Sequence, residues 1–561
     1  MGSATALAFS GMAALPTGTR PGTIFTPFRP APAMPSRALL ALVLAALAAP
    51  FAPAQPVPER HSEVRLFVPD GAPVARPGLA LAERLAAHGL VLDHARVEDT
   101  PHGLAFRTVL SETELAAARA ADVEVEVLVE DVTAHYLATR RGTCEEGMGV
   151  SRIAADLCGP MGGYLTFDGV VAALDTLHAR YPEVVSARAS IGQGHEGRDL
   201  WMVEISDHPG VDEGEPEALY TGVHHAREPG SMMAVLYFMY YLAEQYETNP
   251  EVRDLVDERR LFFVPVVNPD GYVFNETTDP DGGGMWRKNL RDNGDGSFGV
   301  DVNRNYGYEW GYDDVGSSPL PGSETYRGPA PFSEPEIVAL RDFLEGGRRV
   351  SMAFNYHTYS DLLLYPWGYT PDLQTPDDDV FAALGDTLTH VNGYTYGQGS
   401  ITLYLTNGGA YDWMYGEQET KPKAFAFTVE VGYWFWPDPI DVYALADENL
   451  EANLLLARFA GAPPVAAEPP ASPLPGPPLE LTGPNPVRTR TGVAFTLAAP
   501  GPARLAVYDV LGREVAVLAD GPRSAGRNEV AFDASGLAPG VYVLRLTAGG
   551  EAAVRRLTVA R

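Results

Sequence analysis

Cysteine is scarce in this sequence. The 561 residues include 2 cysteines, Cys144 and Cys158, and both fall in one stretch that is typical of a connector. Two thiolates cannot form a four-cysteine metal site, so that class of metal centre is excluded. In an oxidising compartment the pair could close a short loop, which would stabilise the fold by around 3 kcal/mol in the chain-entropy estimate. Otherwise they remain two free thiols.

Positive charge is also scarce. Lysine and arginine number 41 against 73 aspartates and glutamates, which gives a formal net charge of −32. No sustained basic stripe interrupts this excess, so the sequence excludes a nucleic-acid partner. The charge favours solubility and says little about the fold. An anionic substrate would therefore have to be bound by a local cluster of arginines, against the overall field.

No apolar run is long enough for a transmembrane segment. The run Ala38–Ala49 is too short to cross about 30 Å of hydrocarbon as a helix. It follows Met-Pro-Ser-Arg from Met34 and precedes a site with small residues at Ala52 and Ala54, so residues 34–54 are predicted to be a signal peptide and the protein to be secreted or at the cell surface. Residues 1–33 do not fit in front of a signal, so we interpret them as a mis-assigned start and expect the true start at Met34. An intact terminus at Met1 on the precursor would refute this.

The chain is long enough for three or four domains. In residues 60–140 the patterns alternate as strand, helix, strand, strand, helix, strand, with Leu90–Val97 expected as the second strand, and this order fits a ferredoxin-like α+β unit. The unit is expected to be either a packing domain or a pro-domain. The connector 141–159 follows it, and a protease could cut at Arg140–Arg141.

The long central region, residues 160–460, alternates strand-like and helix-like segments. This predicts an α/β domain with a mixed central sheet flanked by helices. Ser351–Tyr356 and Ala424–Val431 are expected to be central strands, and Ser333 is expected to cap a helix that ends at Glu345. A proline-rich linker, 461–479, precedes short alternating strands over 480–561, which predict an all-β sandwich.

One stretch of this domain carries residues suited to a metal. An apolar run stops at Gly222, His225 and Glu228 follow three apart, and Pro229 begins an apolar helical pattern. A turn between a strand and a helix is where open α/β sheets bind ligands, and zinc accepts both imidazole and carboxylate. The spacing alone leaves open whether His224 or His225 faces the glutamate, and whether the pair is only a surface ion pair.

Nine short motifs then follow in the order of one family. They are His225-Ala226-Arg227-Glu228, Asn268-Pro269-Asp270-Gly271-Tyr272, Trp286-Arg287-Lys288-Asn289, Val302-Asn303-Arg304-Asn305, Ser323 to Gly328, His357-Thr358-Tyr359, Tyr404, Gly408 to Trp413, and Thr428-Val429-Glu430. Residues 160–460 resemble the zinc carboxypeptidases of the carboxypeptidase A type, the M14 metallopeptidases. One such motif is weak; nine in sequence are specific.

The resemblance implies one zinc ion per chain, held by His225, Glu228 and His357, with a water in the fourth position. It selects His225 over His224, which is then expected to be a packing residue. It makes Glu430 the general base that takes the proton of the zinc-activated water. It makes Arg287 the cation that polarises the scissile carbonyl.

The resemblance also implies a substrate, a peptide or protein with a free C-terminus. Asn303 and Arg304 match the pair that holds the terminal carboxylate, Tyr404 matches a mobile tyrosine that closes over the substrate, and Arg227 is expected to bind substrate. Tyr411 stands where relatives recognise the terminal side chain. Because Tyr411 is not acidic and Gly399 is expected to leave room nearby, apolar or aromatic ends, or a broad preference, are expected.

The flanking domains have resemblances of their own. The element order of the N-terminal unit is similar to the pro-segment of carboxypeptidase precursors. The tail, with Pro484-Asn485-Pro486, Val507 to Val515 and Gly536 to Tyr542, resembles the C-terminal sorting domain of proteins exported by the type 9 secretion system, whose machinery would be a partner. An ordinary binding sandwich is the alternative. Asp292 to Gly296 resembles part of a calcium loop but lacks the later glutamate of an EF-hand, so a plain turn is expected.

Two other functions compete with a carboxypeptidase. The first is another enzyme of the same family, cutting cell-wall peptides or an N-acyl amino acid; Arg304 with Tyr404 argues for ordinary peptide ends. The second is a non-catalytic surface binding protein, which would have no need of the base Glu430. The sequence leaves open the preferred terminal residue, cleavage at Arg140–Arg141 and the state of the two cysteines.

Overall fold

The structure is a computed structural model, and it describes residues 55–68, 77–147, 157–461, 479–482, 487, 489–497, 499–509, 514–537, 540–548 and 551–559. The expected mis-assigned start, the signal peptide, nearly all of the linker 461–479 and the motif Pro484-Asn485-Pro486 lie outside these residues. Among the described helices, none has the length and apolarity that a membrane span requires.

The N-terminal unit has the expected element order. It consists of β1 (His61–Phe67), α2 (Pro77–Ala86), β2 (Arg96–Thr100), β3 (Gly103–Ser111), α3 (Glu112–Ala120) and β4 (Val125–Val129), followed by α4 (Val132–Thr139). The strands pair antiparallel in the order β2-β3-β1-β4. Ser111 and Glu114 form a capping box at the start of α3.

The expected strand Leu90–Val97 is wrong over most of its length. Strand β2 begins only at Arg96. Leu90 and Leu92 are buried in the core of the unit, but Asp93 and His94 leave it, and His94 has a positive φ of 46° that no strand residue adopts. The pattern was misleading because residues outside the unit bury these two side chains, arginines in the case of Asp93 and aromatic rings in the case of His94.

The large domain is built on one mixed eight-stranded sheet, as predicted. Its order is β11-β10-β12-β9-β7-β8-β6-β5, with β5 (Ala189–Gln193), β6 (Asp199–Ile205), β7 (Glu217–Thr221), β8 (Arg260–Val264), β9 (Val350–His357), β10 (Leu362–Tyr365), β11 (Thr395–Gln398) and β12 (Phe425–Glu430). The central strands β12, β9, β7 and β8 run parallel to one another. Their carboxyl ends therefore share one edge.

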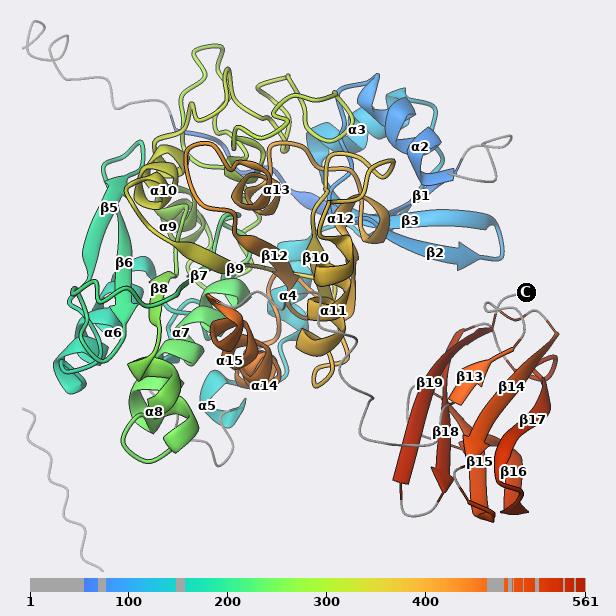
Figure 1. Ribbon diagram of the computed structural model, residues 1–561. Coiled ribbons are helices and arrows are strands. Elements are labelled where there is room, and N and C mark those ends of the chain that lie inside the picture. The colour runs from blue at the N-terminus through green and yellow to red at the C-terminus, as the bar shows by residue number, and fades with distance from the viewer. Residues whose placement is uncertain are drawn as a thin grey trace, which may run out of the picture. The chain divides into compact units, whose positions relative to one another are not determined.

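Helices cover both faces of this sheet (Figure 1) because successive residues of its central strands enter two cores. Ala218 and Tyr220 of β7 face one core, and Leu219 faces the other. The first core is covered by α6 (Phe167–Arg180), α7 (Pro229–Gln245), α11 (Asp378–Leu388), α14 (Val442–Glu448) and α15 (Leu450–Phe459). The second is covered by α10 (Pro335–Glu345) and α13 (Ala410–Gly416). The remaining helices are α5 (Cys144–Gly147), α8 (Pro250–Asp257), α9 (Pro269–Thr278), α12 (Gly399–Thr402), η2 (Val302–Arg304) and η3 (Pro439–Asp441).

Helix α10 does not begin as expected. Its N-cap is Glu334, with Pro335 in the first turn, so the prediction that Ser333 caps the helix is wrong. The Ser333 hydroxyl donates instead to the Glu334 carboxylate at 2.6 Å. Proline at the first helical position removes an N–H that would otherwise need a cap.

Cys144 and Cys158 form a disulfide, which closes the short loop in front of the large domain. The C-terminal region is the predicted all-β sandwich. Its sheets have the orders β13-β14-β17 and β16-β15-β18-β19, and their inner residues form one core. The strands are β13 (Leu479–Leu481), β14 (Arg490–Leu497), β15 (Gly501–Asp509), β16 (Glu514–Arg523), β17 (Gly526–Asp533), β18 (Gly540–Ala548) and β19 (Glu551–Val559).

Candidate active site

Three neighbouring parallel strands bring the predicted residues together. His357 is the last residue of β9 and Glu430 the last of β12, and the two are register partners across the strands. The chain leaves β7 at Thr221 and reaches His225 and Glu228 before α7. All four side chains are buried. The shared carboxyl edge of the sheet is thus the location of the candidate site.

The turn after β7 directs Glu228 inward. Val223 has a positive φ of 48°, and its N–H donates to the Ser231 hydroxyl at 2.9 Å. Pro229 occupies the first turn of α7, as predicted, and Glu228 is the N-cap residue but makes no side-chain cap bond. Its carboxylate is therefore free to turn toward the histidines.

The three predicted metal ligands converge. His225 Nδ1 lies 2.8 Å from Glu228 Oε1, His357 Nδ1 lies 2.8 Å from Glu228 Oε2, and the two Nδ1 atoms are 3.1 Å apart. Two ligands of one tetrahedral zinc are separated by about 3.3 Å. Burial lowers the pKa of His357 to about 4, which keeps its imidazole neutral as a metal ligand must be. The donor set fits zinc.

Outer partners fix these rings. Asp301 Oδ1 lies 3.2 Å from His225 Nε2, and Asn303 Nδ2 lies 3.3 Å from His357 Nε2. A carboxylate on the far nitrogen of a histidine is the usual orienting group of a metal site. His224 turns away, stacks on His357 and lies 2.8 Å from the Tyr306 hydroxyl, where burial holds its pKa well below the ordinary value. It has the place of a packing residue.

The predicted arginines gather around one carboxylate, Asp93 of the N-terminal unit. Arg227 and Arg287 each donate to Asp93 Oδ2 at 2.7 Å, and Arg304 Nη2 lies 3.9 Å from Asp93 Oδ1. The Tyr404 hydroxyl donates to Asp93 Oδ1 at 2.6 Å. Burial alone would raise the pKa of Asp93, but the arginines outweigh it and hold the carboxylate ionised.

Each arginine is also held from its own side. The Asp301 carboxylate accepts from Arg287 at 2.7 and 3.0 Å. Arg304 donates to the carbonyls of Gly316 and Asn303, and its Nη2 has no hydrogen-bond partner among the described residues. Arg227 packs over the Phe435 ring. The cluster is thus a preorganised anion pocket inside a strongly acidic protein.

Glu430 lies at the same edge of the sheet as the predicted metal ligands. It is 4% exposed, and within the described chain its Oε2 makes no hydrogen bond. Burial, and then the charges of Glu228 and Asp93, raise its pKa well above the ordinary value.

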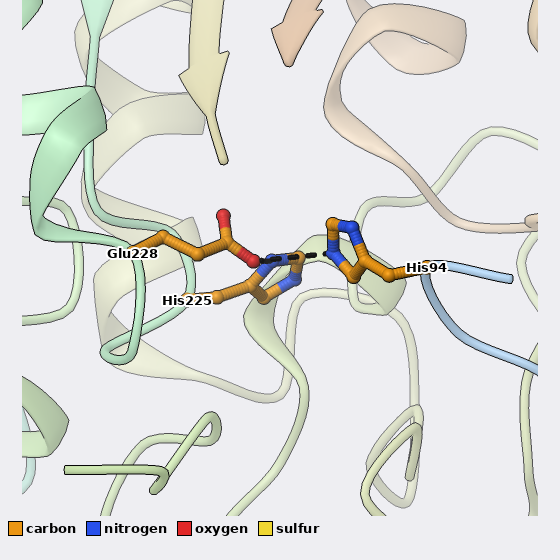
Figure 2. Close-up of side chains that lie close together, drawn as sticks. All are labelled: His94, His225 and Glu228. Atoms are coloured by element: carbon orange, nitrogen blue, oxygen red, sulfur yellow. Dashed lines mark hydrogen bonds and ion pairs between the residues drawn. The ribbon is translucent and has the colours of Figure 1, made fainter. Parts of the chain in front are cut away.

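A histidine of the N-terminal unit also reaches the site. Figure 2 shows His94 extending from the N-terminal chain toward Glu228, opposite His225. Its Nε2 lies 3.3 Å from Glu228 Oε1, and its Nδ1 lies 3.9 Å from Glu430 Oε2.

Residues 170–452, about half of the chain, match the family described as zinc carboxypeptidase. The chain belongs to the zinc carboxypeptidase family. It is 34% identical over 310 residues to a carboxypeptidase B of Astacus astacus, covering 53% of this chain and 96% of that protein. It is 35% identical over 283 residues to a zinc carboxypeptidase of Saccharothrix mutabilis subsp. capreolus, covering 48% of this chain but 62% of that protein.

The fold is that of solved zinc carboxypeptidases. A carboxypeptidase A from Helicoverpa armigera aligns with a TM-score of 0.57 and 23% identity, covering 72% of this chain and 98% of that one. The structural alignment covers 72% of this chain, which is more than the family match over residues 170–452, so the likeness in fold extends outside those residues. Residues 484–560 match the secretion system C-terminal sorting domain, which indicates export.

Tyr411 does not border the open pocket that was expected from the small size of Gly399. It is buried, and its hydroxyl lies 3.3 Å from Thr406 Oγ1. A Cβ atom at Gly399 would lie 2.2 Å from that hydroxyl. The expectation that Gly399 leaves room is wrong here, because the tyrosine itself fills the space. The cavity bordered by His94, Tyr404 and Tyr411 has about 20 Å³ left, roughly room for one water.

The loop Asp292–Gly296 closes on itself, as a plain turn does. Asp292 accepts from the Gly294 N–H at 2.8 Å, and Asp295 accepts from Ser297.

The sequence analysis missed three residues that the structure places in the site: Asp93, His94 and Asp301. Asp301 directly precedes the Val302-Asn303-Arg304 motif, and an acid next to predicted site residues was an available signal. Asp93 and His94 interrupt the apolar run Leu90-Val91-Leu92. A charged pair inside an expected strand was the only sign of their role.

Proposed function

We propose that the protein is a secreted zinc-dependent carboxypeptidase that removes the C-terminal residue of peptides and is made as a latent precursor. The observation that supports this most is the convergence of His225, Glu228 and His357 beside Glu430, whose Oε2 makes no hydrogen bond within the described residues. These four residues lie at one edge of the sheet with the anion pocket of Arg227, Arg287 and Arg304.

The chemistry follows from this arrangement. Zinc bound by His225, Glu228 and His357 would supply a Lewis acid and an activated water at neutral pH. Glu430 accepts the proton of the attacking water and returns it to the leaving amine. Arg287, held by Asp301, donates to the carbonyl oxygen as it gains negative charge. One such donor is worth about 3 kcal/mol of barrier.

The anion pocket is the binding site for the terminal carboxylate of the substrate. Tyr404, which donates to Asp93, and Arg304, whose Nη2 lies 3.9 Å from it, are freed when the N-terminal unit leaves, and Asn303 directly precedes Arg304 in η2. Planar guanidinium groups bind a carboxylate through paired hydrogen bonds. Tyr411 borders the same cavity and favours apolar or aromatic terminal side chains.

Residues 60–140 are the pro-domain, and the cut falls at Arg140–Arg141. Both arginines are exposed between α4 and α5. Their bonds to the Asp281 carbonyl and to Asp438 and Asp441 lie on the surface. The signal peptide exports the chain, and the C-terminal domain passes it to the type 9 machinery, which leaves the enzyme released or attached to the cell surface.

The test measures turnover and zinc content of the Glu430→Gln variant after the chain has been cut at Arg140–Arg141 and loaded with zinc. Since glutamine cannot accept the proton, turnover of a peptide panel should fall about 10²- to 10⁴-fold while zinc content stays unchanged. Glu336→Gln, a buried glutamate elsewhere in the domain, is the matched control and should retain turnover. Full turnover by Glu430→Gln would overturn the assignment of the base. Equal cleavage of C-terminally amidated peptides would favour the other activities of the family.

A further inference from the structure

The segment before β2 fixes one histidine ring at the site. His94 is 1% exposed, stacks on Tyr359 with centroids 5.5 Å apart and meets the edge of Phe435 at 4.9 Å. Asp93, the preceding residue, is held by two arginines and Tyr404. The contacts with these two rings and the anchored neighbour hold the His94 ring at the site.

The nitrogens of this ring have no ordinary partner. Both Nδ1 and Nε2 are buried and make no hydrogen bond within the described residues. A buried polar atom without a partner costs free energy, so it calls for an explanation. Nε2 lies 3.3 Å from Glu228 Oε1, and ligand atoms of His94, His225 and Glu228 all lie within 4.8 Å of one another (Figure 2).

We infer that His94 is a further ligand of the metal in the uncut chain, at the position that a catalytic zinc leaves to water. A catalytic zinc has three protein ligands and one open position, whereas a structural zinc has four protein ligands. With His94 bound, the precursor therefore has a closed site of the structural type. The inference rests on the proposed function for the identity of the metal.

This role adds to that of Asp93. Asp93 occupies the anion pocket, and His94 excludes water from the metal, so two adjacent residues block substrate and nucleophile together. Since both belong to the N-terminal unit, one cut that releases it removes both. The predicted consequence is that the precursor holds its metal more firmly than the cut enzyme.

The experiment compares the uncut full chain with its His94→Phe variant. Phenylalanine keeps the ring contacts to Tyr359 and Phe435 but offers no nitrogen. X-ray absorption of the zinc-loaded chains should show one imidazole fewer in the variant. Metal loss to a chelator should be at least about tenfold faster. His88→Ala, an exposed histidine of the same unit, is the matched control and should behave as the parent chain.

A second comparison needs no variant. Cobalt-substituted parent chain should change its visible spectrum on cutting at Arg140–Arg141, because a water replaces an imidazole. Equal imidazole counts for the parent and His94→Phe chains, or equal rates of metal loss, would overturn the inference. A cut parent chain that binds zinc but hydrolyses no peptide would overturn the proposed function and leave the role of His94 intact.

Discussion

The cluster at the strand ends can be compared with a second cluster of similar composition. His195, Glu334 and Glu336 also bring a histidine and two carboxylates within reach of one ion. In that cluster His195 Nε2 lies 2.9 Å from Glu334, and Asn289 donates to both glutamates. Arg291 adds an ion pair to Glu334.

The two clusters differ in what satisfies their polar atoms. The hydrogen bonds of His195, Ser333 and Asn289 overcome the effect of burial and lower the pKa of Glu334, so it is ionised and paired. Burial raises the pKa of Glu336 to about 7, so it holds a proton below that pH. At the strand ends, in contrast, two Nδ1 atoms and a carboxylate face one point. A histidine close to a glutamate is therefore not sufficient for a metal site. Their free lone pairs must also point to one common position, where the ion can bind.

Among the variants that distinguish the two clusters, His357→Ala is expected to have the largest effect on zinc affinity. Removing a metal ligand should lower zinc affinity more than about 100-fold, beyond the usual cost of losing an outer partner. Zinc content after dialysis measures this. His195→Ala is the control and should keep its zinc; loss of zinc from that variant would place the metal in the second cluster.

A smaller effect is expected for Asp301→Asn. Asparagine leaves His225 Nε2 and Arg287 without the carboxylate that orients them, so zinc affinity should fall about 10- to 100-fold. Competition with a zinc indicator measures it. If affinity stayed unchanged, Asp301 would serve the fold and not the metal site.

The smallest effect concerns stability and pH. The pKa of Glu336 is about 7 in the folded state and near 4.5 in the unfolded state. Its contribution to the free energy of unfolding is therefore fully present below pH 4.5 and is lost as the pH rises through 7. Between pH 5.5 and 7.5 the free energy of unfolding should fall by about 1 to 2 kcal/mol from this group. Denaturant unfolding of Glu336→Gln at both values should lack that decrease, with Glu345→Gln, a more exposed glutamate on the same helix, as control. An equal decrease in both variants would show that Glu336 is not the titrating group.

Much of the fold was predictable because strand and helix patterns are local. The mixed sheet, the sandwich, the element order of the N-terminal unit and the opening of α7 by Pro229 all agree with the structure. Two boundaries failed, one because of neighbouring residues and one because of longer-range contacts. Ser333 does not cap α10, because the helix begins with Glu334 and Pro335. Leu90–Val97 is not a strand over most of its length, because Asp93 contacts Arg227 and His94 contacts Glu228, each more than 130 positions away.

The site was predicted as far as its motifs reach. His225, Glu228, His357 and Glu430 lie together because each is at or just after the end of a strand whose position the topology fixes. The arginines lie on connecting segments and gather around Asp93. Spacing could not choose between His224 and His225, whereas the family resemblance selected His225. In the structure His225 contacts Glu228 and His224 stacks on His357.

The sequence by itself determined the domain order, the edge of the sheet where the polar residues gather and the kind of ligands that gather there, because these follow from local periodicity and residue chemistry. Only the tertiary structure decided that the N-terminal unit places Asp93 in the anion pocket and His94 at the metal ligands. The reason is physical: a buried charge needs a partner, and which distant residues supply that partner depends on how two folded units meet.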